Sequence, residues 1–230
     1  VLEHPRLPFI SYPYEWCFSA LKDAALLQLD IQLEALERGV TLTDASAYNV
    51  QFLGAKPIFL DNLSFRRYRD GEFWDGHRQF CEQYVNPLLL RSVLGVPHNP
   101  WFRGSLEGIT AEELSRVLPW RSRLSWNILT NVFMQARLQR TAGDGASLAK
   151  AQSRRLPKIG FEQMLRGLRN WIAKLEPAAD GKMRLHGQIV PLQGVEQQVR
   201  VAGRAAANIV ERCRIVHQIR WHVGVSGQIV

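Results

Sequence analysis

The sequence is poor in cysteine and has no long apolar run. Its three cysteines, Cys17, Cys81 and Cys213, are widely separated within 230 residues, which argues against a disulfide framework and against a CxxC-type zinc site. No apolar run approaches the roughly 20 residues that cross a bilayer, and Pro5 and Pro8 interrupt the segment where a signal peptide would begin. We therefore expect a cytoplasmic protein with no membrane partner and with buried structural thiols.

Acidic residues are also scarce, with 21 Asp and Glu against 29 Lys and Arg and a formal net charge of +8. Residues 177–230 contain seven basic and three acidic residues, a net charge of +4, and Trp221 is their one aromatic residue. Such a segment has few large side chains with which to build a core. We expect a folded domain over residues 1–176 and a basic, atypical and poorly ordered tail over residues 177–230. The hypothesis that the chain is a basic nucleic-acid-binding module rests on its charge alone. We therefore expect no nucleic-acid partner.

Apolar side chains recur at three- and four-residue spacing from Glu15 to Arg38, and Gly39 follows as a stop signal. This predicts a buried helix. Two short apolar runs, Tyr48–Leu53 and Pro57–Leu60, flank Gly54-Ala55-Lys56 and predict a hairpin. Further helices are predicted over Phe73–Tyr84, Pro87–Leu94, Ala111–Leu118, Ser125–Gln139 and Gly160–Leu175, the third after a capping box formed by Thr110 and Glu113. The fold class is therefore α+β, mostly helical, with a small β-hairpin.

The segment Val40–Phe65 carries the most informative polar residues. Asp44 follows the predicted buried helix, Asn49 comes five residues later, and Asp61 ends the second strand of the predicted hairpin. Kinase-like phosphotransferases use this order: the first Asp accepts the hydroxyl proton of the acceptor, and the Asn and second Asp ligate magnesium. A hairpin returns its far end to its near end, so Asn49 and Asp61 can face one ion. The segment thus resembles the C-terminal, helical lobe of a kinase-like fold.

A plainer interpretation stays open, because an Asp followed five residues later by Asn is common. Asp44 could cap a turn, Asn49 could start a strand and Asp61 could be a loop residue. Leu42 and Thr43 also stand where a His often precedes the first Asp, and no Gly-rich loop or phosphate-binding Lys lies upstream. We therefore expect the N-terminal lobe to be absent, Asp44 to be a vestigial base, any binding of magnesium and ATP to be weak, and this chain alone to be inactive.

Three runs carry a resemblance to a known family: residues 4–65, residues 76–90 (GHRQFCEQYVNPLLL) and residues 95–109 (GVPHNPWFRGSLEGI). They resemble the N-terminal region of bacterial class I SAM-dependent methyltransferase-like proteins related to nodulation proteins, over about residues 1–175. The resemblance implies an ancillary kinase-like region ahead of a methyltransferase domain. The Gly-rich strand–turn–helix that binds SAM in such a domain does not follow Leu175, so we expect SAM to bind only in the missing domain. The expected partners are the missing kinase-like lobe and that methyltransferase domain.

Overall fold

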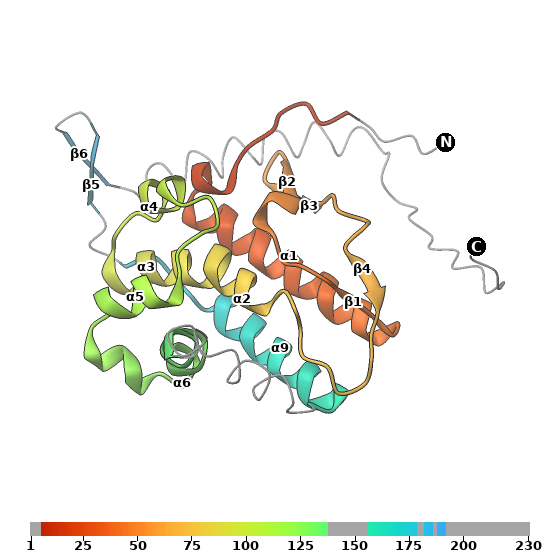
Figure 1. Cartoon of the computed structure of the whole chain (residues 1–230). Helices are drawn as coiled ribbons and strands as arrows, with labels where there is room; N and C mark the ends of the chain where they lie inside the picture. The colour runs from red at the N-terminus through yellow and green to blue at the C-terminus, as the bar shows by residue number, and fades with distance from the viewer. Residues whose placement is uncertain (1–5, 138–155, 179–181, 186–187, 192–230) are drawn as a thin grey trace.

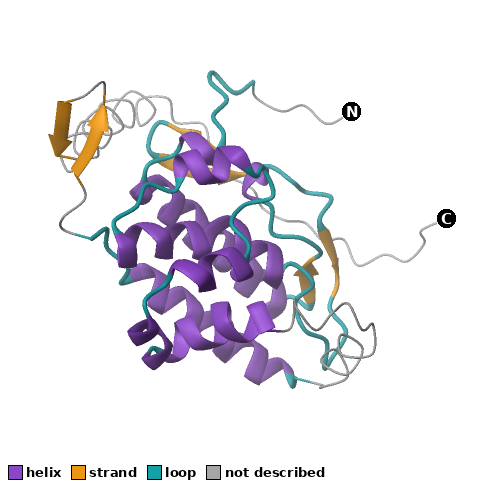
Figure 2. Cartoon of the chain, turned by 60° about the vertical axis from the view of Figure 1, so that its left-hand side comes forward, coloured by secondary structure: helices purple, strands orange, loops and turns teal. Residues whose placement is uncertain are grey.

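The computed structural model describes residues 6–137, 156–178, 182–185 and 188–191. Its helices form the bulk of the molecule, and its short strand pairs lie at the edges (Figure 2). The described part is therefore α+β and mostly helical, as the sequence predicted. Three two-stranded antiparallel pairs are present among these residues: β1 with β4, β2 with β3, and β5 with β6. The last pair, β5 (Lys182–Leu185) and β6 (Gln188–Pro191), lies in the expected tail, of which the structure otherwise describes only residues 177–178.

The helix α1 (Phe18–Glu37) is the long central element, and α9 (Lys158–Ala173) packs along it (Figure 1). The apolar spacing of α1 places Leu21, Leu29 and Leu36 in the core with no exposed surface. The prediction of a buried helix is therefore confirmed. The chain turns away at Gly39, whose φ of 72° is a left-handed conformation that favours glycine.

Two antiparallel strand pairs follow α1. The first, β2 (Val50–Leu53) with β3 (Lys56–Phe59), is the predicted hairpin, although Lys56 begins β3 and pairs with Leu53 instead of lying in the turn. The second pair was not predicted: β1 (Val40–Leu42) lies against β4 (Phe65–Arg67). Because β4 returns to β1 around the hairpin, the loops that begin at residue 43 and at residue 60 come to the same place.

A continuous helical segment over residues 77–94 lies beneath these loops. It consists of α2 (His77–Phe80), the π-helical turn η3 (Cys81–Val85) and α3 (Asn86–Leu94). The sequence predicted two helices broken before Pro87, because proline removes a backbone hydrogen bond within a helix. The helix instead continues through Pro87 by way of the π-helical turn, and the Glu82 carbonyl five residues earlier accepts from the N–H of Ile109 at 2.9 Å.

The remaining short elements complete the helical body. The capping box at the start of α5 (Ala111–Val117) is confirmed: the Glu113 backbone N–H donates to Thr110 Oγ1 at 3.2 Å, and the Thr110 N–H donates to Glu113 Oε2 at 3.1 Å. The helix predicted over Ser125–Gln139 is interrupted by a π-helical turn, and its last two residues lie outside the described part of the chain. The short elements are η1 (Pro13–Glu15), η2 (Ala47–Asn49), α4 (Asn99–Gly104), α5 (Ala111–Val117), η4 (Trp120–Leu124), α6 (Trp126–Ile128) and η5 (Leu129–Met134).

Candidate functional site

The loop that carries Asp44 is held from below by two glutamines on the 77–94 helical segment. Gln79 and Gln83 are one helical turn apart, so their side chains lie on the same face. Gln79 Oε1 accepts a hydrogen bond from the backbone N–H of Ala45 at 2.8 Å, and Gln83 Oε1 accepts one from that of Ala47 at 2.7 Å. Two backbone donors that have no partner within a helix or sheet are thereby satisfied.

A third glutamine holds the strand that leads into this loop. Gln32 lies fully buried on α1. Its Oε1 accepts from the backbone N–H of Leu42 at 2.9 Å, and its Nε2 donates to Thr41 Oγ1 at 2.8 Å. No sequence pattern singled out these glutamines in advance. The available signal was a neutral polar residue on the buried face of a predicted apolar helix, because buried polar groups need partners.

Close packing fixes the loop from the side as well. A Cβ atom on Gly76 would lie 2.8 Å from the carbonyl carbon of Asp44 and 2.8 Å from Trp74 Nε1. Only a residue without a side chain therefore allows the start of α2 to approach the loop this closely.

The three polar residues singled out from the sequence converge. The Asn49 backbone carbonyl accepts from the N–H of Leu60 at 2.8 Å, which places the residue before Asp61 beside Asn49. Asn49 Nδ2 lies 3.3 and 3.4 Å from the two carboxylate oxygens of Asp44 and 3.2 Å from Asp61 Oδ2. The hairpin thus brings its two ends together as the spacing predicted.

Ser64 joins this cluster, and the sequence analysis did not find it. Its backbone carbonyl accepts from the N–H of Thr43 at 2.8 Å, next to β1. Its hydroxyl lies 3.0 Å from Asp44 Oδ1 and also contacts Asp61 Oδ2. A hydroxyl has one proton, so Ser64 donates to one of the two carboxylates at a time. The pairing of β1 with β4 positions Ser64, and no local sequence pattern predicted that pairing.

Hydrogen bonds keep the pKa of Asp61 below its usual range. The largest cause is the Ser64 hydroxyl, and the backbone N–H groups of Leu63 and Ser64 act in the same direction, while burial opposes them. The Leu63 N–H donates to Asp61 Oδ1 at 2.9 Å. Asp61 is therefore ionised at neutral pH.

The cluster supplies oxygen atoms of the kind that hard cations prefer. Two carboxylates, one hydroxyl and one carboxamide are ligands suited to Mg²⁺. Asn49 presents its NH₂ group to the carboxylates here, so its amide would have to turn for its oxygen to face a cation. Among the described residues, no group of three or more His, Cys, Asp or Glu could hold a metal ion. A cation at this position would therefore need the Asn49 oxygen together with oxygens from water or from a bound ligand.

The cysteines do not contribute to this site. Cys81 is buried, as expected, and burial raises the pKa of its thiol to about 12. Cys17 is only half-buried because it precedes α1 at the edge of the core, which corrects the expectation for this residue. Both are free thiols, and Cys213 lies outside the described residues. A protonated buried thiol is chemically inert.

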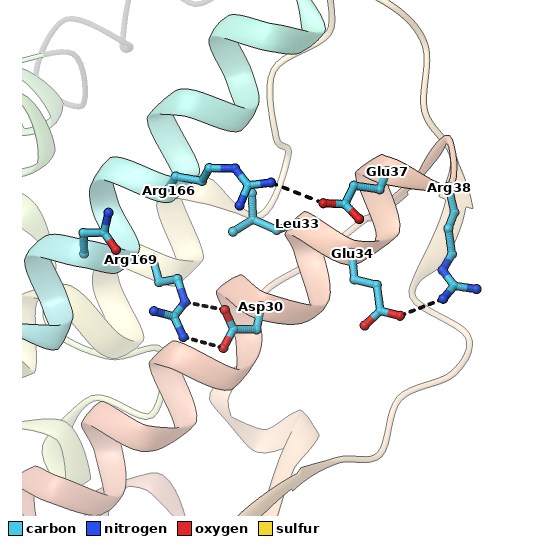
Figure 3. A pocket seen from close by; sticks show the side chains of 8 residues that line it. Asp30, Leu33, Glu34, Glu37, Arg38, Arg166 and Arg169 are labelled. Carbon is cyan, nitrogen blue, oxygen red and sulfur yellow. Dashed lines mark hydrogen bonds and ion pairs between the residues drawn. The ribbon is translucent and has the colours of Figure 1, made fainter. Parts of the chain in front are cut away.

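A separate groove lies between α1 and α9 (Figure 3). It encloses about 500 Å³ and shares no residue with the cluster described above. Two pairs of its charged side chains span the two helices: Arg169 binds Asp30 through two hydrogen bonds, and Arg166 lies 3.2 Å from Glu37. A third pair, Arg38 with Glu34 at 2.8 Å, lies at the end of α1. The groove therefore presents ion pairs, with little unpaired charge available for a ligand.

Comparison with known proteins shows that the chain is related to nodulation proteins. It is 47% identical over 178 residues to the nodulation protein NoeA of Rhizobium meliloti (strain 1021). The aligned part covers 76% of this chain and 37% of NoeA, so the chain spans little more than a third of the length of that relative. No family model matches the sequence, and no solved structure matches it. The nodulation-related part of the resemblance is thereby confirmed; its kinase-like and methyltransferase parts stay predictions.

Proposed function

We propose that this chain is the helical, kinase-like part of a longer protein, and that Asp44, Asn49 and Asp61 bind a divalent cation together with a nucleoside triphosphate. The convergence of these three side chains supports the proposal most directly. Their order along the chain is the one in which a kinase-like site presents a base, a metal-binding amide and a metal-binding carboxylate. In this assignment Asn49 and Asp61 hold Mg²⁺, and Asp44 orients an acceptor hydroxyl or accepts its proton.

Electrostatics make a cation the natural ligand of this cluster. The carboxylates of Asp44 and Asp61 are close enough to share Asn49 and Ser64 as donors. Two negative charges at that separation repel each other, and a divalent ion between or beside them removes the repulsion. None of the hydrogen bonds within the cluster comes from a lysine or an arginine among the described residues. The cation would therefore have to offset the triphosphate charge without help from a basic side chain. We expect the nucleotide to bind this chain alone only weakly for that reason.

We assign this chain an ancillary role next to a methyltransferase domain of the same polypeptide, in the cytoplasm, where magnesium and nucleotides are present. The resemblance of residues 1–175 to methyltransferase-like proteins supports this role, and the greater length of NoeA leaves room for such a domain. S-adenosylmethionine would bind in that domain. Methyl transfer and phosphoryl transfer would both require groups from the rest of the longer protein, because transfer depends on positioning supplied from both sides of a site.

Cation titration tests the proposal. Calorimetry with Mg²⁺, and paramagnetic resonance with Mn²⁺, should show saturable binding to the chain that MgATP strengthens. Asp61→Asn should lower the affinity for the cation roughly ten-fold or more, because it removes a charged ligand. Asp70→Asn is the matched control. Asp70 is exposed on the loop after β4, and this substitution changes the net charge by the same amount as Asp61→Asn.

Two outcomes would contradict the proposal. Absence of saturable cation binding at millimolar concentration would remove the site. Equal weakening by Asp61→Asn and Asp70→Asn would show a general charge effect with no specific ligand. We also expect no ATP turnover by the chain alone; turnover that disappears in Asp44→Ala would show instead that the chain is a working phosphotransferase.

A further inference from the structure

The end of α5, the turn η4 and the first residue of α6 together form a corner of the molecule, residues 116–126, that we call the η4 corner. It lies at the lower left of Figure 1, away from the β2–β3 hairpin. Three large apolar side chains project from it: Trp120 is 69% exposed, Leu124 is 80% exposed and Trp126 is 72% exposed. Three large apolar side chains exposed within seven residues of the chain are a candidate interaction site.

The backbone of the η4 corner is ordered by its own contacts. Leu118 and Ser122 are buried beneath it. The Ser122 N–H donates to the carbonyl of Pro119 at 2.9 Å, and the Ser125 N–H donates to that of Ser122 at 3.2 Å. The inward-facing residues thus fix a short helical turn whose other residues necessarily point outward. The exposure of the tryptophans follows from this turn.

The η4 corner is also strongly basic. Residues 116–126 contain Arg116, Arg121 and Arg123, all exposed, and no Asp or Glu. Arg116 pairs with Glu112 one turn earlier on α5, so Arg121 and Arg123 supply the positive charge of the corner. The Arg121 guanidinium lies 5.8 Å from the centre of the Trp120 ring. Neither Arg121 nor Arg123 forms an ion pair with a carboxylate in the described part of the chain. Apolar side chains at the tip and arginines beside them complement a surface that is anionic outside and apolar beneath.

We propose that the η4 corner binds the surface of an anionic lipid bilayer, with Trp120, Leu124 and Trp126 inserted at the headgroup level and the arginines on the lipid phosphates. Tryptophan favours this interfacial depth because its ring is apolar and its N–H is polar. Basic residues add attraction to anionic lipids. No helix in the described part of the chain is long and apolar enough to cross a membrane, so this is attachment to one face. This inference departs from the expectation, drawn from the sequence, that the protein has no membrane partner.

Other occupants fit the η4 corner less well. The three side chains are largely exposed, so a protein partner would need a pocket shaped to receive them. A nucleic-acid strand can stack on tryptophan, but Leu124, the most exposed of the three, offers no stacking surface. A second copy of the chain, related by two-fold symmetry, would bring the same arginines face to face. A bilayer accepts projecting side chains without a matching pocket.

Vesicle co-sedimentation of the full chain tests this inference. Binding should appear with phosphatidylcholine vesicles that contain about 30% phosphatidylglycerol, and should fall with added salt and in pure phosphatidylcholine. The double variant Trp120→Ala/Trp126→Ala should bind roughly ten-fold more weakly, and Arg121→Gln/Arg123→Gln should lose the preference for anionic lipid. Ile159→Ala, which removes a side chain that is 74% exposed at the start of α9, should bind as the wild type does.

A second readout locates the contact. Brominated lipids should quench the tryptophan fluorescence of the wild type, and this quenching should disappear in Trp120→Phe/Trp126→Phe. Equal vesicle binding by the wild type and the tryptophan variants would overturn the inference, as would no binding to anionic vesicles. Tighter binding to an oligothymidine strand than to the vesicles would also overturn it, in favour of a nucleic-acid surface.

Discussion

His98 offers the sharpest test of how the core is built. Its side chain is 2% exposed, and it lies just before α4. Its Nε2 lies 3.2 Å from the backbone carbonyl of Trp16, so Nε2 carries the proton and donates it. Its Nδ1 is buried without a hydrogen-bond partner. A second proton would therefore place a charged N–H in the core with nothing to accept it.

This environment lowers the pKa of His98 to about 4. Burial is the main cause and the positive charge of Arg91 adds to it, while the hydrogen bond to Trp16 opposes them. The folded pKa thus lies below the ordinary value of 6.5, so the unfolded chain binds the proton first as pH falls. The stabilisation from neutral His98 is complete above about pH 6.5 and is lost as the pH falls toward 4. The loss amounts to about 2 kcal/mol at pH 5 and about 3 kcal/mol at pH 4.

The variant His98→Gln isolates this effect, because a glutamine amide can still donate to the Trp16 carbonyl but cannot titrate. Urea unfolding at pH 7 and pH 5 should show that the wild type loses about 2 kcal/mol more than the variant. His77, whose pKa is also lowered to about 4 by burial, is present in both proteins and cancels. Identical pH dependence in wild type and variant would refute the reasoning.

Three further substitutions test the core and the supports of the site. Gln28→Met should raise the free energy of unfolding by about 1–2 kcal/mol in urea titration, because both polar atoms of the buried Gln28 amide lack partners; a loss of stability would mean that the amide is satisfied. Gln83→Leu should cost about 1–3 kcal/mol by leaving the Ala47 N–H unpaired, whereas Gln83→Glu, which keeps an acceptor, should cost less; equal costs would show that this bond contributes little. Gly76→Ala should lower the melting temperature and weaken any cation binding together, since the added methyl group meets the Asp44 backbone; an unchanged affinity would show that the loop yields freely.

Local signals account for what the sequence predicted correctly. The apolar spacing of α1, its glycine stop and the two short runs of the hairpin each lie within a window of about 20 residues, where periodicity is readable. Asn49 and Asp61 were placed together because a hairpin returns its ends to one point, and Asp44 was added because it precedes Asn49 in the order of a kinase-like site. No longer-range information was needed for that inference.

What the sequence did not predict depends on contacts between distant segments. The strands β1 and β4 have three residues each, which is too short for alternation to be visible, and they pair only because the hairpin returns the chain. Ser64 and Gln83 acquire their partners through that return and through the packing of the 77–94 segment. Pro87 suggested a helix break, and the π-helical turn that avoids the break is a tertiary adjustment with no sequence signature.

The use of glutamines under the Asp44 loop has a consequence for the conditions in which the loop keeps its shape. A carboxylate or a guanidinium in the same positions would tie the loop geometry to its own ionisation and to ionic strength. Neutral amides neither gain nor lose a proton, and dissolved ions screen them little. The backbone around Asp44 should therefore hold one conformation while the charges of Asp44 and Asp61, and any ion between them, change above it.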